Sequence, residues 1–318
     1  MQEVTGSTPV FSTKGGPHGP PFAFMPLPAT LRDRLTERLS AHFGRPLDME
    51  RETPVGGGSI NDSYRLETSE GPFFVKVNSA DHFPSMFEAE ADGLKRLAAT
   101  GTIRVPQVIA TGEDHDDSYL LLEGVKGGLK TTAFWEAFGR ALARLHRNTN
   151  ACFGLERDNW IGTLEQVNTP GTDWPAFFIQ HRLEALVRTA CDRQRIGMGE
   201  ALRFERLYVK LPSLFPPEPP ALLHGDLWSG NFLCDEHDRP VLIDPAVYYG
   251  HREMDIAMTR LFGGFDTAFY VAYNAESPLE QGWEERVDLC NLYPLLVHVN
   301  LFGGGYAQQV GAVLRRYV

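Results

Sequence analysis

An eight-residue string, HGDLWSGN at residues 224–231, combines the residue types that phosphoryl transfer needs. The carboxylate of Asp226 could accept the proton of an acceptor hydroxyl or orient that hydroxyl. The neutral amide oxygen of Asn231, five residues later, could ligate Mg²⁺ without adding negative charge near phosphates. An Asp followed by an Asn in a loop behind a short apolar run, here Ala221–Leu223, is the arrangement that phosphotransferases use. We therefore predict Asp226 as the catalytic base and Asn231 as a metal ligand.

A second carboxylate, Asp244, follows the apolar run Val241–Ile243, thirteen residues after Asn231. An apolar strand that delivers one aspartate into a binding site can supply another Mg²⁺ ligand. A single aspartate at the end of a strand is also a frequent turn residue or cap. Its place downstream of Asp226 favours the metal, and we predict Asp244 as the second protein ligand.

A glycine-rich string further upstream could hold phosphate. Gly56, Gly57, Gly58 and Ser59 lie between two expected strands, and glycines let backbone N–H groups approach an anion closely. The string lacks the Gly-Lys-Ser/Thr of a P-loop, and a strand rather than a helix follows it, unlike a dinucleotide-binding fingerprint. On its own it is more typical of an ordinary hairpin turn.

Lys76 lies inside the otherwise apolar run FFVKV at residues 73–77. If its side chain points inward, it needs an anion or a partner carboxylate. The next helix offers Glu88 and Glu90 as partners. A solvated lysine on an edge strand is the alternative.

The elements that must position these residues fall into two groups. In the first, apolar periodicity predicts helices at 31–43 and 87–97. Short extended runs broken by glycines and turn residues predict strands at 50–55, 63–68, 72–77, 107–112 and 118–123. Gly124, Gly127 and Gly128 then suggest a hinge. In the second, helices are expected at 134–145, 177–187, 201–211, 254–262 and 287–302, with a proline-rich connector at 212–220 and a strand–loop–strand passage at 221–246.

The predicted fold class is therefore α+β, with a small, mainly β lobe joined to a larger, mainly α lobe. Residues 1–28 hold so many glycines and prolines that we predict a disordered tail, and both Met1 and Met25 stay open as the start. Residues 29–126 are expected to form the lobe that binds the nucleotide phosphates. Residues 127–318 are expected to carry the catalytic loop and the acceptor site.

Composition excludes several other classes of protein. The 318 residues include 30 Lys and Arg against 41 Asp and Glu, a net charge of −11, which disfavours a nucleic-acid partner. The longest apolar runs fall far short of the ~20 residues of a membrane-spanning helix, so no membrane partner is expected. The 4 cysteines form no C-x-x-C pair, and Met1–Pro9 does not read as a signal peptide. We expect a cytoplasmic protein.

Taken together, these features have the order of a protein-kinase-like ATP site, with two departures. Gly225 stands where eukaryotic protein kinases carry the Arg of His-Arg-Asp. Only about ten residues separate Asp244 from the helix near Glu253, and no Ala-Pro-Glu string follows. Little room is left for a regulated activation loop, so the acceptor should be small or a small group displayed on something larger.

Several strings closely resemble the fructosamine-3-kinase / ketosamine-3-kinase family, over most of the chain. They include GGGSIND (56–62), FFVKVN (73–78), DWPAFFIQHRL (173–183), LLHGDLWSGN (222–231) and IDPAVYYGHREMDIAM (243–258). These are more specific than the HGDxxxxN pattern that aminoglycoside and choline kinases share.

The resemblance implies a protein-kinase-like bilobal fold, with a five-stranded antiparallel sheet plus a helix in the N-terminal lobe and a mainly α-helical C-terminal lobe. It implies ATP and Mg²⁺ as cofactors, and it supports the roles given to Asp226, Asn231 and Asp244. Lys76 resembles the phosphate-binding lysine, with Glu90 rather than Glu88 as its partner. The hinge segment, made of Glu123, Gly124 and Val125, should contact adenine through its backbone.

Recognition of the acceptor is harder to read from the sequence. Polar and aromatic residues of the kind that line sugar-binding sites occur at several positions, and we expect an acceptor site among Asp158, Asn159, Trp160, Asp173, Arg182 and Trp228. For Trp160 and Trp174, ordinary packing between helices is the alternative.

The resemblance implies phosphorylation of the 3-hydroxyl of a ketosamine, either a small molecule or an adduct on a protein lysine, in a deglycation repair reaction. A kinase of an aminoglycoside, choline or another small alcohol is the alternative, and a pseudokinase that only binds nucleotide is a further one. Both a monomer and a homodimer stay open.

Overall fold

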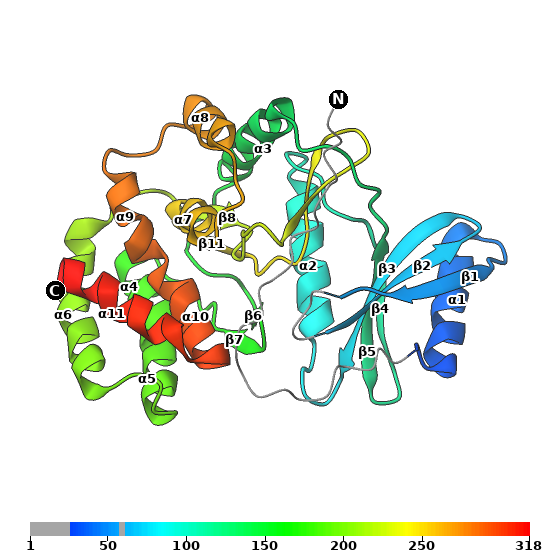
Figure 1. Cartoon of the computed structure of the whole chain (residues 1–318), viewed down its shortest axis with the longest axis horizontal. Coiled ribbons are helices and arrows are strands. Elements are labelled where there is room, and N and C mark those ends of the chain that lie inside the picture. The colour runs from blue at the N-terminus through cyan, green and yellow to red at the C-terminus, as the bar shows by residue number, and fades with distance from the viewer. Residues whose placement is uncertain (1–25, 57–60) are drawn as a thin grey trace, which may run out of the picture.

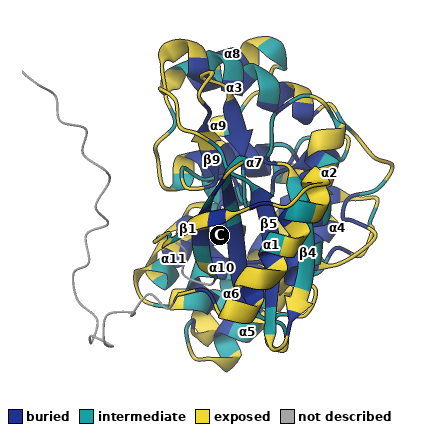
Figure 2. Cartoon of the chain, turned by 90° about the vertical axis from the view of Figure 1, so that its right-hand side faces the viewer, coloured by how far each residue is buried: buried dark blue, intermediate teal, exposed yellow. Residues whose placement is uncertain are grey.

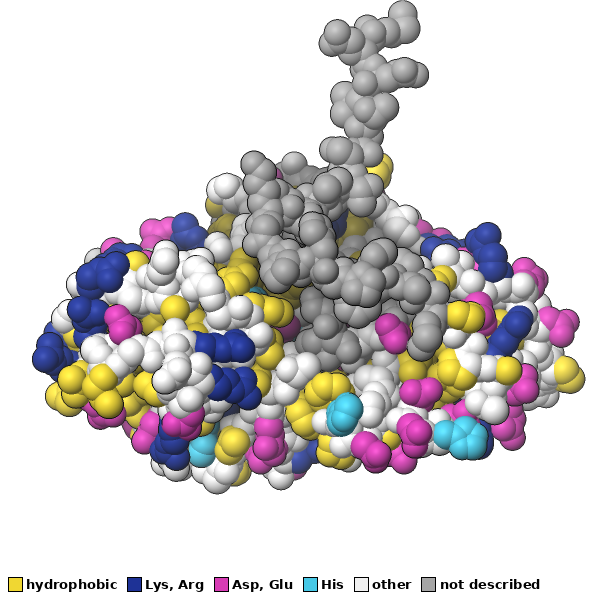
Figure 3. All heavy atoms as spheres, turned by 60° about the horizontal axis from the view of Figure 1, so that its bottom comes forward, with side chains coloured by type: hydrophobic (Ala, Val, Ile, Leu, Met, Phe, Trp, Pro, Cys, Tyr) yellow, Lys and Arg dark blue, Asp and Glu magenta, His cyan; other side chains and the backbone are white. Residues whose placement is uncertain are grey.

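The computed structural model describes residues 26–56 and 61–318. The predicted phosphate-loop residues Gly57, Gly58 and Ser59 lie outside the described residues, as does the predicted tail up to residue 25. Within the described part, none of the helices combines the length and the apolar character needed to span a bilayer. Figure 3 shows acidic and basic side chains intermingled over the described surface of one face.

The N-terminal lobe contains a five-stranded antiparallel sheet, as predicted. Its strand order is β1-β2-β3-β5-β4. Its strands are β1 (Met49–Pro54), β2 (Asp62–Thr68), β3 (Gly71–Ser79), β4 (Val108–Asp114) and β5 (Asp117–Glu123). Helix α1 (Ala29–Phe43) lies on the outer side of the sheet, and α2 (Met86–Ala99) lies between the sheet and the other lobe (Figure 1).

The alternation of side chains along β3 decides which of them face the catalytic side. Val75 packs on the same face as Leu31, Leu35 and Leu39, the buried stripe of α1, whose other side is exposed (Figure 2). Because successive side chains of a strand point to opposite faces, Lys76 points to the face that α2 covers.

The predicted tail extends too far at its C-terminal end. Leu27 is only 5% exposed and belongs to the core between α1 and the sheet. The carbonyl of Pro28 accepts a hydrogen bond from the backbone N–H of Arg32 and so begins α1. Residues 26–28 therefore belong to the folded lobe, because an apolar side chain at position 27 can be buried beneath the helix.

The C-terminal lobe is mainly helical and lies on the left of Figure 1. Its helices are α3 (Thr132–Leu145), α4 (Trp174–Phe178), the π-helix η1 (Ile179–Glu184), α5 (Ala185–Asp192), α6 (Met198–Leu214), α7 (Glu253–Leu261), α8 (Thr267–Glu276), α9 (Trp283–Cys290), α10 (Leu292–Phe302) and α11 (Gly305–Tyr317). Three strand pairs complete it: β6 (Asn159–Ile161) with β7 (Leu164–Gln166), β8 (Ala221–Leu223) with β11 (Tyr248–Gly250), and β9 (Phe232–Cys234) with β10 (Pro240–Leu242).

Several boundaries in this lobe differ from those predicted. Helix α6 continues through Pro212 and ends at Leu214, inside the predicted connector, although Pro212 cannot donate an i→i−4 hydrogen bond. The predicted helix at 287–302 is two helices that meet at Asn291. The sequence analysis missed α8, α11 and the β6–β7 hairpin. Helix α8, TAFYVAYNAE, has apolar residues around most of its circumference, so no single stripe marked it.

The contact between α3 and α8 yields a test of this packing. A Cβ at Gly139 of α3 would lie 2.1 Å from the carbonyl oxygen of Phe269 in α8. We expect Gly139→Ala to destabilise the fold by about 1–3 kcal/mol, as overpacking does. The control is Gly199→Ala in α6, where an added Cβ meets nothing within 4 Å. It should stabilise the chain by up to about 1 kcal/mol. Urea unfolding measures both, and equal effects would contradict the packing.

Candidate active site

A buried ammonium group joins the two lobes. Lys76 is 5% exposed, and its Nζ lies 2.7 Å from Oε1 of Glu90 on α2 and 2.8 Å from Oδ1 of Asp244 in the C-terminal lobe. Burial alone would lower the pKa of Lys76, but the carboxylates of Asp244 and Glu90 outweigh it and hold this pKa above its usual range. Lys76 is thus a charged centre shared by two predicted site residues.

The partner of Lys76 is Glu90, as predicted, and not Glu88. Burial raises the pKa of the Glu90 carboxyl, against the opposing effect of the Lys76 charge. A buried carboxylate of this kind is stable only with a cation beside it. The ion pair with Lys76 therefore also fixes the position of α2.

The catalytic loop between β8 and β9 holds Asp226 and Asn231 together. The amide nitrogen of Asn231 donates to both the carbonyl oxygen and Oδ2 of Asp226, each at 2.9 Å. The backbone N–H of Ile243 donates to the carbonyl of Asn231 at 3.1 Å, which brings Asp244, the next residue, beside the loop. Burial of Asp226 and then the negative charge of Asp244 raise the pKa of Asp226 to about 7.

His224 and Gly225 attach this loop to the chain after β10. The His224 ring donates from Nε2 to the Ile243 carbonyl at 2.9 Å and accepts the Asp226 N–H at Nδ1, consistent with a neutral ring, and burial lowers its pKa. Gly225 has φ +84°, and a Cβ there would lie 2.0 Å from the carbonyl oxygen of Ala246. The position that carries Arg in protein kinases is thus restricted to glycine by close backbone contact.

Asp255 of α7 holds the start of the catalytic loop through hydrogen bonds to its backbone, a role that the sequence analysis missed. Its two oxygens accept the backbone N–H groups of His224 and Gly225 at 2.7 and 2.9 Å. His146 donates to Oδ2 from Nε2 at 3.2 Å and accepts the Tyr273 hydroxyl at Nδ1. Burial alone would raise the pKa of Asp255. The hydrogen bond and charge of His146, and then the other contacts, outweigh burial and hold this pKa below its usual value. The signal available in the sequence was an acidic residue, Asp255, within the otherwise apolar run MDIAM at residues 254–258.

The donor set beside the loop fits a hard cation. Because the amide nitrogen of Asn231 is committed to Asp226, its oxygen is the free end of the side chain. Asp244 keeps 42% of its side chain exposed, and its φ of +55° is unusual for a residue other than glycine, as at many functional sites. Among the described residues no cluster of three or more His, Cys, Asp or Glu could hold a metal. Oxygen donors from two residues match Mg²⁺, which completes its shell with phosphates and water.

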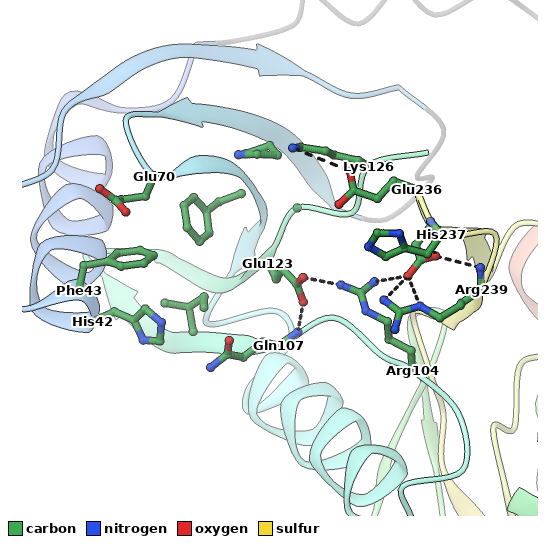
Figure 4. A pocket seen from close by; sticks show the side chains of 15 residues that line it. His42, Phe43, Glu70, Arg104, Gln107, Glu123, Lys126, Glu236, His237 and Arg239 are labelled. Atoms are coloured by element: carbon green, nitrogen blue, oxygen red, sulfur yellow. Dashed lines mark hydrogen bonds and ion pairs between the residues drawn. The ribbon is translucent and has the colours of Figure 1, made fainter. Parts of the chain in front are cut away.

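Two of the predicted hinge residues, Glu123 and Gly124, line a cavity of about 340 Å³, which Figure 4 shows. The end of α1, the hinge and the β9–β10 turn line this cavity, whereas Lys76 and Asp226 do not. The Glu123 carboxylate points into it and accepts hydrogen bonds from Arg104 and from the Gln107 N–H. Both oxygens of the Glu123 carboxylate thus already accept hydrogen bonds from the protein.

The hinge backbone is partly committed as well. The N–H of Gly124 donates to the Pro72 carbonyl at 3.0 Å. Of the three predicted hinge residues, Val125 has a backbone N–H that meets no acceptor within the described part of the chain. Gly56, the one described member of the glycine string, follows β1 and is exposed.

Of the predicted acceptor residues, Trp228 is the one that lies in the catalytic loop. Its half-buried ring covers Gly230, where a Cβ would lie 2.4 Å from the indole, and it meets Phe262 edge-on at 6.0 Å between ring centroids. Phe262 in turn contacts His298 at 5.1 Å. The contacts continue to two further rings, and we name the whole set the aromatic wall: Trp228, Phe262, His298, Phe302 and Tyr306. Apart from Trp228, the sequence analysis missed it because its members come from distant segments.

Two other predicted acceptor residues, Asn159 and Arg182, are buried and bonded to other residues of the chain, so their contact with an acceptor stays a prediction. They are 5% and 0% exposed. The Asn159 amide donates to the Val247 carbonyl at 2.8 Å. The Arg182 guanidinium donates to Asn168 Oδ1 at 2.7 Å and lies over the Tyr248 ring at 4.0 Å.

The remaining predicted acceptor residues also have structural partners. Asp173 is exposed and caps α4, accepting the Ala176 N–H at 2.9 Å. Asp158 is exposed and accepts the Asn168 N–H at 2.7 Å. Trp160 packs edge-on against Phe83 at 5.9 Å between centroids. Trp174 is buried among aromatic rings, which is the packing alternative.

Comparison with known proteins agrees with the fold and identifies similar kinases. The family described as fructosamine kinase matches residues 32–318. A probable ketoamine kinase of Synechocystis is 44% identical over 89% of this chain and 95% of its own length. The chloroplastic protein-ribulosamine 3-kinase of Arabidopsis thaliana is 36% identical over 93% of this chain and 90% of its own. The crystal structure of a candidate fructosamine-3-kinase from Haemophilus somnus superposes with a TM-score of 0.82 at 30% identity, over 89% of this chain and 96% of that one.

The contribution of the Lys76 ammonium to the stability of the fold can be tested. Lys76→Met would leave Glu90 buried and Asp244 without their common cation, and we expect a loss of about 3–5 kcal/mol. Adding Glu90→Gln should recover part of this loss, because it removes the unpaired buried charge. Thermal and urea unfolding measure both variants. The control is Lys95→Met on the exposed side of α2. A Lys76 variant as stable as the Lys95 variant would refute the assignment.

Proposed function

This chain belongs to the fructosamine kinase family and is a kinase that uses ATP, and on that premise we propose that it phosphorylates the 3-hydroxyl of ketosamines. The observation that carries the proposal is the match to the family over residues 32–318. The relatives named as ketoamine and ribulosamine kinases support ribulosamine or fructosamine adducts as acceptors, free or attached to protein lysines.

Asp226 is the proposed catalytic base. The acceptor hydroxyl gives its proton to the Asp226 carboxylate while its oxygen attacks the γ-phosphorus, and the bond from that phosphorus to the leaving oxygen of ADP breaks. The hydrogen bond from Asn231 holds the Asp226 carboxylate in place for this role. A raised pKa suits a group that must take up a proton near neutral pH.

Asn231 and Asp244 are proposed to hold Mg²⁺, which when bound neutralises charge on the phosphates. Lys76 is proposed to meet the phosphates as well, because its ammonium already lies between Glu90 and Asp244. Gly56, Gly57, Gly58 and Ser59 are proposed to cover the phosphates with backbone N–H groups. Among the hinge residues, Val125 is proposed to donate its N–H to adenine.

The aromatic wall is the proposed binding surface for the acceptor. Trp228 lies two residues after Asp226 and presents a half-exposed indole on which a sugar could stack. The amine of a ketosamine is normally protonated, and a chain with a net charge of −11 tolerates a cation near its acidic side chains. Phosphorylation next to the ketone makes the adduct prone to eliminate phosphate and release the original amine, a repair reaction.

A panel of acceptors tests the substrate. We expect ATP-dependent formation of a 3-phosphate on ribuloselysine or fructoselysine, with little turnover of free fructose, free ribulose, choline or an aminoglycoside. Phosphate NMR of the products identifies the modified hydroxyl, and coupled detection of ADP gives the rates. Equal turnover of sugars that lack the amine would contradict the ketosamine assignment. Preference for an aminoglycoside or choline would establish the other small-alcohol class.

The metal ligands give a second, independent test. We expect Asn231→Ala and Asp244→Ala each to lower kcat by about 10²-fold or more, because phosphoryl transfer relies on electrostatic stabilisation by the metal. EDTA should abolish turnover, and Mg²⁺ should restore it. Asp226→Asn should abolish transfer while ATP still binds, as calorimetry would detect. Turnover that survives EDTA or the loss of Asp226 would refute the mechanism.

A further inference from the structure

Helix α2, which carries Glu90, contacts the C-terminal lobe at three levels. In the turn that leads into its N-terminal end, three residues before Met86, Phe83 meets Trp160 of β6 edge-on, with ring centroids 5.9 Å apart and planes at 86°. In the middle, a Cβ at Gly93 would lie 3.1 Å from a methyl group of Val247, so the helix backbone approaches that segment closely. Toward its C-terminal end, Arg96 forms an ion pair with Glu156.

The side of the C-terminal lobe that α2 contacts is itself tightly connected. The amide of Asn159, next to Trp160, donates to the Val247 carbonyl at 2.8 Å. Gln166 of β7 donates to the Ala246 carbonyl at 3.1 Å and to Asn159 Oδ1 at 2.7 Å. The Tyr293 hydroxyl in turn donates to Gln166. We name the β6–β7 hairpin and the segment 245–247 the platform, because these buried bonds join them into one unit.

The platform also carries Asp244, the other partner of Lys76, at its edge. Asp244 directly precedes residue 245, and Lys76 lies between Asp244 and Glu90 at 2.8 and 2.7 Å. The distance between these two carboxylates is thus set on one side by the platform and on the other by α2. In protein kinases, the position of the corresponding helix is controlled by phosphorylation of the activation loop.

No such control fits this chain. The residues after Asp244 enter β11 at Tyr248 and α7 at Glu253, so the described chain leaves little length there for an activation loop. Resting on the proposed function, we propose that Trp160 is a positioning residue for phosphoryl transfer: through Phe83 it holds α2 against the platform and so keeps Glu90 at Lys76. The β6–β7 hairpin thus keeps the Lys76–Glu90 ion pair formed, whereas protein kinases regulate the formation of this pair.

Binding of nucleotides tests this without any acceptor. Lys76 is proposed to meet the phosphates and not adenine, so we expect Trp160→Ala to raise the Kd of Mg-ATP about tenfold, the scale of one charge-assisted hydrogen bond. The Kd of adenosine should stay unchanged. Trp160→Phe should restore Mg-ATP binding, because an aromatic ring still meets Phe83. The control is Trp283→Ala in α9, another half-exposed tryptophan, which should change neither constant.

A double-mutant cycle shows whether Trp160 acts through Glu90. Glu90→Gln removes the carboxylate that Trp160 positions, so the double variant Trp160→Ala/Glu90→Gln should bind Mg-ATP no more weakly than Glu90→Gln alone. Effects that multiply in the double variant would overturn the proposal. An equal loss of adenosine and Mg-ATP binding in Trp160→Ala would overturn it too, since that marks general damage to the fold.

If Trp160→Ala does not fold, Phe83→Ala removes the same contact from the other side and should give the same selective loss of Mg-ATP binding. Unchanged binding of Mg-ATP by a folded Phe83→Ala variant would overturn the proposal. A wild-type chain that turns over no ketosamine but shows the expected cycle would refute the proposed acceptor and leave the role of Trp160 standing.

Discussion

The ammonium group of Lys76, shared between Glu90 and Asp244, is the interaction on which the rest of the site depends. It joins a strand and a helix of one lobe to a loop of the other through contacts of 2.7 and 2.8 Å. A buried pair of this kind contributes little net stability, but removal of one partner is costly. The Lys76 ammonium therefore ties the two lobes together at the site, and both lobes must present a carboxylate to it.

Buried polar networks hold the catalytic loop and the segment after Asp244 in place. Asp255 fixes the backbone of the catalytic loop, and Asn231 fixes the carboxylate of Asp226. The platform does the same for the segment that follows Asp244, through Asn159 and Gln166. Each network satisfies buried donors with specific acceptors, which makes a second arrangement of the site costly. These buried hydrogen bonds therefore fix the positions of the site residues in the C-terminal lobe.

The glycines between the lobes serve close packing more than free movement. A Cβ at Gly124 would lie 2.5 Å from the Pro72 carbonyl oxygen, and one at Gly128 would lie 1.9 Å from that of Asp235. Backbone hydrogen bonds from both residues hold the linker against the two lobes. The sequence suggested a hinge at these glycines, and the structure gives a reason for glycine that does not require bending. The boundary between residues 126 and 127 stays a prediction.

The sequence by itself determined the parts of the protein that depend on short-range patterns. Asp226 and Asn231 lie five residues apart in one loop, and short extended runs bounded by glycines and turn residues marked the five strands of the sheet. Only the tertiary structure decided the rest. The residue pattern alone left both Glu88 and Glu90 open as partners of Lys76. The family resemblance favoured Glu90, and the packing of α2 on the sheet supplies the physical reason, because the two side chains point to different sides of the helix. Asn159, Arg182 and the aromatic wall have partners tens of residues away or more, so their burial or exposure follows from contacts that no local spacing encodes.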